Sequence, residues 1–153
     1  MQTTPKQTGH FESFDGTPIY YEVRGEGEPL VLVYGIACIM NHWHHQIEYF
    51  SRNYKVITFD LRGHHLSMDH LGQDVIGLLT HLKVKKAHFA GHSFGAPLIL
   101  NIHKLKPDLF KSMIFINGFA RNPIKGMFGL DVVEPFFYFV KSQYKAQPDL
   151  WNT

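Results

Sequence analysis

A serine framed by two glycines is the part of this sequence best suited to chemistry. Ser93 lies at the centre of the segment Gly91–Gly95, which reads GHSFG. Residues 87–90 are predicted to form a strand before it, and the pattern from 93 to about 106 predicts a helix after it. A strand-to-helix turn needs glycines beside such a serine, because its backbone is strained and leaves little room for neighbouring side chains. This context predicts a nucleophilic hydroxyl raised above a sheet, rather than a serine that only caps a helix.

A serine that attacks an acyl carbon also needs hydrogen-bond donors for the oxyanion that forms. The N–H of Phe94 lies at the start of the predicted helix, where partial positive charge favours an anion. The second predicted donor is the N–H of Ile36, because Gly35 allows the backbone to approach closely after the apolar run 30–34. We therefore expect Ser93, Phe94 and Ile36 to form one acyl-transfer site.

The elements that must position these residues alternate between strands and helices. Strands predicted at 10–14 and 17–23 flank Asp15-Gly16 and form an antiparallel hairpin. The continuous apolar run at 30–34 predicts a strand covered on both faces, and a second buried strand is predicted at 54–59. The remaining predicted elements are a helix capped by Asn41, an amphipathic helix at 69–82, the helix that stops before Pro107, and a strand at 111–116. This order predicts an α/β fold with a doubly wound, mostly parallel sheet and an antiparallel N-terminal hairpin.

The pattern changes after residue 118. Residues 1–118 hold the predicted sheet and its helices, whereas aromatic residues over 119–153 are scattered among Gly and Pro. We expect 1–118 to be the N-terminal part of a core and 119–153 to begin a helical cap over the site. No repeat or low-complexity tract divides the sequence.

Composition limits the classes of partner. The 153-residue chain is 44% hydrophobic, which is enough for a single core. Its net charge is +2 and its longest basic run is Lys85-Lys86, so no nucleic-acid partner is predicted. No stretch approaches the roughly 18 apolar residues that span a bilayer, and the first residues are polar. We expect a cytoplasmic protein without a membrane span or signal peptide.

Histidine and cysteine are the remaining candidates for site chemistry. Eleven histidines are many for this length, but His42, His44 and His45 have no cysteine or carboxylate at ligand spacing, so no metal site is predicted. Cys38 is the only cysteine and is expected to be a small buried hydrophobic residue.

Taken together, the motifs resemble the N-terminal portion of the α/β-hydrolase family, in its serine-nucleophile, esterase- and lipase-like branch. The matching pieces are Asp15-Gly16, Tyr34-Gly35-Ile36, Asp60-Leu61-Arg62-Gly63-His64 with Ser67, Asp74, the Ser93 turn, and Ile114-Phe115-Ile116-Asn117-Gly118. The resemblance implies hydrolysis of a carboxylic ester or related acyl bond through an acyl-enzyme on Ser93. It implies no metal and no organic cofactor. The aromatic cap region favours a small-molecule substrate with an apolar group.

The sequence departs from the family pattern at several positions. Tyr34 replaces the usual histidine before the oxyanion glycine, and His65 replaces a glycine. The segment between Ser67 and Asp69 is about ten residues shorter than the resemblance implies. Downstream of Ser93 the only histidine is His103, which lies roughly 15 Å along the predicted helix and is too remote to accept its proton.

The triad base and acid are therefore expected in downstream sequence that this chain does not contain. Asn117, at the end of the strand after the Ser93 helix, is not a carboxylate. If the chain is a fragment, the strand at 111–116 becomes an exposed apolar edge, and either a complementing C-terminal segment or a second copy of the chain should cover it. Two alternative functions use the same turn. One is a cofactor-free perhydrolase or a carbon–carbon bond hydrolase, and the other is a catalytically silent, hydrolase-like binding module.

Overall fold

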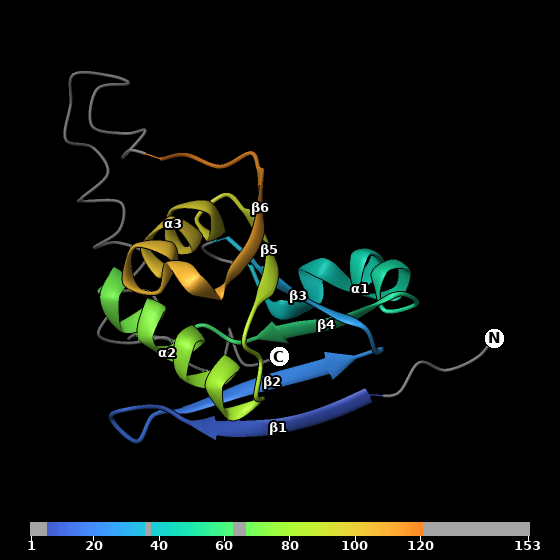
Figure 1. Ribbon diagram of the computed structural model, residues 1–153, viewed down its shortest axis with the longest axis horizontal. Helices are drawn as coiled ribbons and strands as arrows, with labels where there is room; N and C mark the ends of the chain where they lie inside the picture. The colour runs from blue at the N-terminus through green and yellow to red at the C-terminus, as the bar shows by residue number, and fades with distance from the viewer. Residues whose placement is uncertain (1–5, 36–37, 63–66, 121–153) are drawn as a thin grey trace, which may run out of the picture. The chain divides into compact units, whose positions relative to one another are not determined.

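The computed structural model describes residues 6–35, 38–62 and 67–120, which form a six-stranded sheet with helices on both faces (Figure 1). The strand order is β1-β2-β4-β3-β5-β6. The strands are β1 (Lys6–Glu12), β2 (Pro18–Arg24), β3 (Glu28–Val33), β4 (Tyr54–Phe59), β5 (Ala87–His92) and β6 (Phe110–Ile116). Strands β1 and β2 are antiparallel to their neighbours, whereas β4, β3, β5 and β6 run parallel. The structure confirms the predicted α/β class and the antiparallel hairpin at its start.

Successive side chains of the central strands point to opposite faces of the sheet and pack into two separate hydrophobic cores. This is expected for parallel strands covered on both faces. On one face, Val31 and Val33 of β3 pack with α2 (Met68–His81) and α3 (Gly95–Leu105). On the other face, Leu30 and Leu32 pack with Trp43 and Ile47. Those two residues come from the short 3-10 helix η1 (Met40–Trp43) and from α1 (His44–Phe50). A second 3-10 helix, η2 (Pro107–Leu109), connects α3 to β6.

The two faces are visible in Figure 1, where α2 and α3 lie on one side of the sheet and α1 lies on the other. The predicted amphipathic helix is α2, and its apolar stripe of Leu71, Val75, Leu78 and Leu79 is buried. Ser67 caps this helix by accepting a hydrogen bond from the N–H of His70 at 3.1 Å. None of the helices in the described part of the chain is both long enough and apolar enough to span a bilayer.

Two local predictions were wrong. The hairpin turn is wider than a two-residue Asp15-Gly16 turn, because pairing ends at Glu12 and Pro18 and the N–H of Ser13 donates to the carbonyl of Thr17. Asn41 does not cap a helix. It lies inside η1, where its carbonyl accepts a hydrogen bond from the backbone of the next turn. Asp15 of the hairpin is held by Arg62, and Trp43 of η1 is buried in the core, and short-range turn preferences include neither contact.

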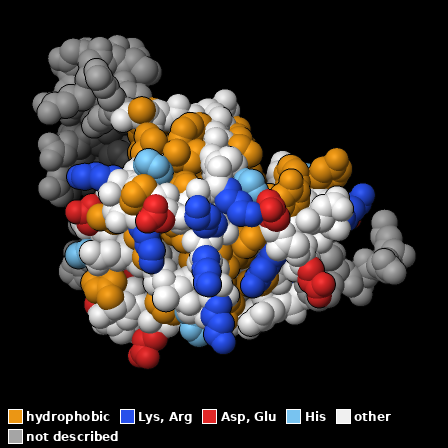
Figure 2. Space-filling model, in the orientation of Figure 1, with side chains coloured by type: hydrophobic (Ala, Val, Ile, Leu, Met, Phe, Trp, Pro, Cys, Tyr) orange, Lys and Arg blue, Asp and Glu red, His pale blue; other side chains and the backbone are white. Residues whose placement is uncertain are grey.

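Strand β6 forms one edge of the described sheet, and its apolar side chains are exposed. Ile114, Phe115 and Ile116 are exposed by 50%, 46% and 39%. Figure 2 shows hydrophobic side chains gathered at the surface in the region where Figure 1 draws β6. The predicted cap begins at residue 119, and residues 121–153 lie outside the described residues, so the cap stays a prediction.

Candidate active site

Ser93 lies at a sharp turn between β5 and α3. Its φ angle is +52°, in the left-handed region that a residue with a side chain rarely adopts. The N–H of Ser93 donates to the carbonyl of Ile116 at 3.0 Å, and its own carbonyl accepts from the N–H of Ala96 at 3.1 Å. Both bonds hold a conformation that costs free energy, as often found at functional sites. The half-buried Ser93 therefore has the backbone geometry that its sequence context predicted.

The two glycines of the turn allow α3 to pack directly against the strands. A methyl group added at Gly91 would lie 2.6 Å from Ile99 Cδ1, and one added at Gly95 would lie 2.3 Å from the carbonyl oxygen of Val33. Neither position has room for a side chain, because protein interiors are close-packed. Glycine is required here for packing, and this packing brings the start of α3 beside the end of β3.

The loop after β3 reaches the Ser93 hydroxyl. A methyl group added at Gly35 would lie 3.0 Å from Ser93 Cβ and 3.4 Å from Ser93 Oγ. This close approach agrees with the reason for expecting an oxyanion donor in the loop. Ile36 itself lies outside the described residues, as do His64 and His65, so the role of the Ile36 N–H stays a prediction.

Tyr34 connects the loops that follow β3 and β4. Its hydroxyl accepts a hydrogen bond from the N–H of Leu61 at 2.7 Å. The ring is buried in the core under α1. Tyr34 therefore positions the neighbouring loop.

Phe94 immediately precedes α3 and has φ −60° and ψ −24°. The first N–H groups of a helix have no carbonyl in a preceding turn to bind, so they are available to an anion. Its ring packs against the larger core. The position suits the predicted oxyanion donor, although the role of this N–H also stays a prediction.

A buried ion-pair network positions the loop after β4. The Arg62 side chain is fully buried and donates to Asp74 Oδ1 and Oδ2 at 2.5 and 2.6 Å. It also donates to Asp15 Oδ2 at 2.6 Å, and the hydroxyl of Ser13 donates to Asp74. Hydrogen bonding from Arg62 holds the pKa of the Asp15 carboxyl well below its ordinary range. The family resemblance included Arg62 and Asp74, but only the folded chain shows that they form a pair.

The histidines fall into separate environments. His103 packs edge-on against Phe110 with 5.1 Å between ring centroids. His42 and His92 stack at 4.9 Å with an interplanar angle of 27°. Their ring nitrogens lie near the thiol of Cys38, with all three ligand atoms within 4.8 Å of one another. Sequence reasoning missed this group because it did not pair Cys38 with His42 four residues later, and because His92 joins them only when β3 pairs with β5.

Residues 28–144 match the family model of the α/β-hydrolase fold. This chain belongs to the α/β-hydrolase fold family.

Individual members of the α/β-hydrolase family show the extent of the similarity. An (E)-2-((N-methylformamido)methylene)succinate hydrolase from Acinetobacter baylyi is 39% identical over 110 residues, which are 67% of this chain and 41% of the relative. A strigolactone esterase from Pisum sativum is 28% identical over 153 residues, which cover 86% of this chain and 57% of the relative. An esterase from Thermogutta terrifontis superimposes with a TM-score of 0.69 and 26% identity, over 76% of this chain and 48% of the esterase. The chain therefore spans less than two thirds of each of these three proteins.

Proposed function

We propose that this chain carries the nucleophile and oxyanion donors of a serine hydrolase acting on a carboxylic ester or a related acyl bond. The observation that carries the proposal is the strained Ser93 turn, whose hydroxyl meets the backbone of the loop at Gly35. Strain of this kind clusters at active sites, where it can present a reacting group. The hydrolase and esterase named among the family members support the same class of reaction.

In the proposed reaction, Ser93 Oγ forms a bond to the acyl carbon and its proton passes to a general base. The carbonyl π electrons move to the oxygen, and the N–H groups of Phe94 and Ile36 hold the resulting oxyanion. Collapse of this intermediate breaks the ester bond, and the alcohol leaves with the proton from the base. Water then attacks the acyl-enzyme by the same steps, releases the acid and restores the Ser93 hydroxyl.

The proposal places the base and its acid outside this chain. His103 packs with Phe110 at the far end of α3, and Asn117 carries no carboxylate. We propose that the segment supplying these groups also covers the exposed edge of β6, because the apolar side chains there need a neighbour. A second copy of the chain is the alternative cover. The proposed substrate is a small molecule with an apolar group, and the proposed reaction uses no cofactor.

Active-site labelling with a fluorophosphonate probe tests the nucleophile directly. We expect slow covalent labelling of the wild-type chain, because without the base the oxyanion donors alone give only residual activation. Substitution Ser93→Ala should abolish the labelling, and peptide mapping should locate the adduct on Ser93.

Ser112→Ala is a matched control. The Ser112 hydroxyl lies 2.8 Å from His88 Nδ1, and His88 Nε2 lies 2.8 Å from Glu28, so this serine also has an imidazole partner. It lies on exposed β6 without the strained turn. Labelling that persists in Ser93→Ala and disappears in Ser112→Ala would refute the proposal, and a folded wild-type chain that takes no label would favour a silent binding module.

A substrate panel separates the remaining hydrolytic alternatives. The panel contains p-nitrophenyl esters of increasing chain length, an ester with added hydrogen peroxide, and a β-diketone. Release of acid and alcohol from the esters is the expected result. Formation of peracid would instead indicate a perhydrolase, and cleavage of the diketone would indicate a carbon–carbon bond hydrolase.

A further inference from the structure

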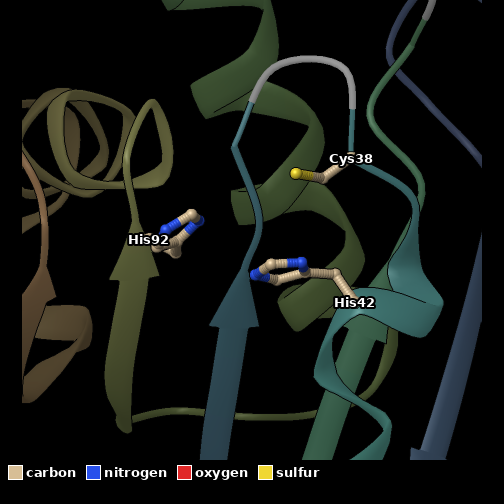
Figure 3. Close-up of side chains that lie close together, drawn as sticks. All are labelled: Cys38, His42 and His92. Carbon is tan, nitrogen blue, oxygen red and sulfur yellow. The ribbon is translucent and has the colours of Figure 1, made fainter.

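Three potential metal ligands from different segments converge beside the Ser93 turn. Cys38 lies in the loop after β3, His42 lies in η1, and His92 is the last residue of β5. Figure 3 shows the three side chains pointing toward one another around the end of β3. One ligand atom from each residue lies within 4.8 Å of those of the other two. A thiol and two imidazoles at such distances form the donor set of a three-ligand zinc site.

The geometry is close to what a metal requires. Zn²⁺ binds thiolate at about 2.3 Å and imidazole nitrogen at about 2.0–2.1 Å, so tetrahedral ligand atoms lie roughly 3.3–3.7 Å apart. The three side chains would have to close by about 1 Å from their present separation of up to 4.8 Å. His42 is exposed and Cys38 is half-buried, so rotation of these two side chains can bring the ligands together.

His92 provides an independent reason to expect a ligand. Its Nδ1 atom is buried and has no hydrogen-bond partner among the described residues. A buried polar atom without a partner is unfavourable and is rare in native structures. The ring is held by stacking on His42 and by an edge-on contact with Trp43, whose centroid lies 6.4 Å away. A cation bound between the three side chains would supply the missing partner.

We propose that Cys38, His42 and His92 bind a zinc-like divalent cation, and that binding blocks Ser93. On binding, the Cys38 thiol releases its proton to solvent and the thiolate and two neutral imidazoles donate electron pairs, with water at the fourth position. Thiolate and imidazole favour Zn²⁺ over Mg²⁺ or Ca²⁺, which prefer oxygen ligands.

The expected block follows from the positions of the ligands. The cation would tie the loop after β3 to the residue directly before Ser93, and Gly35 of this loop already lies against the Ser93 side chain. We expect a loop tied at Cys38 to move away from Ser93 less readily and so to admit an acyl group more slowly. This inhibitory role rests on the proposed function of Ser93, whereas the binding of the metal does not.

Titration of the purified 153-residue chain with Co²⁺ tests the binding. We expect a thiolate-to-metal charge-transfer band that saturates at one equivalent and is displaced by Zn²⁺ but not by excess Mg²⁺. Cys38→Ser should remove the band, and His92→Gln should weaken binding at least about tenfold, since even loss of an outer-shell partner costs that much. His45→Gln changes an exposed histidine outside the cluster and is the matched control. Absence of the band in folded wild-type chain, or its retention in Cys38→Ser, would overturn the proposal.

Fluorophosphonate labelling with and without Zn²⁺ tests the block. Zn²⁺ should slow labelling of Ser93 at least about tenfold, a chelator should restore it, and Cys38→Ser should label equally under both conditions. Labelling that is unchanged by bound Zn²⁺ would overturn the inhibitory role. If Ser93 takes no label even with chelator, the proposed function fails, and the Co²⁺ titration of the Ser93→Ala chain still decides whether the metal site exists.

Discussion

Gly35 is the residue of the loop after β3 that lies against the Ser93 side chain. A methyl group added there would lie 3.0 Å from Ser93 Cβ, a tight contact that requires one of the two segments to move by a few tenths of an ångström. We expect Gly35→Ala to shift the loop or the serine by a few tenths of an ångström and to lower the rate of fluorophosphonate labelling, by less than the roughly 100-fold that a 1 Å misplacement can cost. Rates of labelling at several probe concentrations measure the change.

Gly16→Ala is a control for the general cost of replacing a glycine. Gly16 has φ +82° and open space around it, so the substitution strains the backbone far from Ser93. It should lower the free energy of unfolding by about 1 kcal/mol and leave the labelling rate unchanged. Equal loss of labelling in the two variants would show that Gly35 has no special relation to the site.

Arg62 determines whether the loop after β4 keeps its place. Replacement by methionine would remove both hydrogen bonds to Asp74 and leave a buried carboxylate, whose side chain is 4% exposed, without its counter-ion. Breaking such a pair from one side costs about 3–5 kcal/mol. We expect urea denaturation of Arg62→Met to show a loss of that size.

Arg24→Met provides the comparison for this substitution. Arg24 pairs with Glu22 at 3.1 Å, and its side chain is 38% exposed. An exposed pair contributes roughly 0–1 kcal/mol, so this variant should unfold at nearly the wild-type urea concentration. Similar losses of unfolding free energy in Arg62→Met and Arg24→Met would mean that the buried network contributes no more to stability than an exposed ion pair.

Asp15, in the hairpin loop, should make the stability of this network depend on pH. The pKa of Asp15 is lowered below its ordinary value near 3.8, mainly by hydrogen bonding from Arg62. A depressed pKa gives stability that is complete above the ordinary value and is lost as the pH falls through the lowered one. Between about pH 6 and pH 3, wild-type chain should therefore lose more unfolding free energy than Asp15→Asn.

Urea denaturation at each pH measures this difference between the two chains. Both chains contain the other carboxyls, including Glu22 and Glu28 with their lowered pKa values. The contributions of these groups to the pH dependence of the unfolding free energy therefore cancel in the difference. Asp108→Asn, in η2 and outside the network, should follow the wild-type curve. Parallel curves for wild type and Asp15→Asn would contradict the assignment.

For the whole molecule, we predict that the exposed edge at β6 promotes association of the chain. An open strand with exposed apolar side chains is a template for pairing with another chain. We expect Ile114→Lys, at a residue that is 50% exposed, to reduce self-association measured by sedimentation velocity. Tyr49→Lys introduces the same charge at a 64% exposed residue of α1 and should have no such effect. Reduced association in both variants would indicate a general effect of charge.

The sequence by itself determined the elements and the turn that presents Ser93. Hydrophobic periodicity and local turn chemistry act over a few residues, so strands, helices and the glycines of Gly91–Gly95 could be read directly. Some errors fell where a loop side chain has a distant partner, as with Asp15, which is held by Arg62.

Only the tertiary structure decided which loops meet. The order β4-β3-β5 places the ends of strands that are far apart in the sequence side by side. This arrangement brings Gly35 against Ser93 and gathers Cys38, His42 and His92. Contacts of this kind depend on strand pairing between distant segments, and no local pattern in the sequence encodes them.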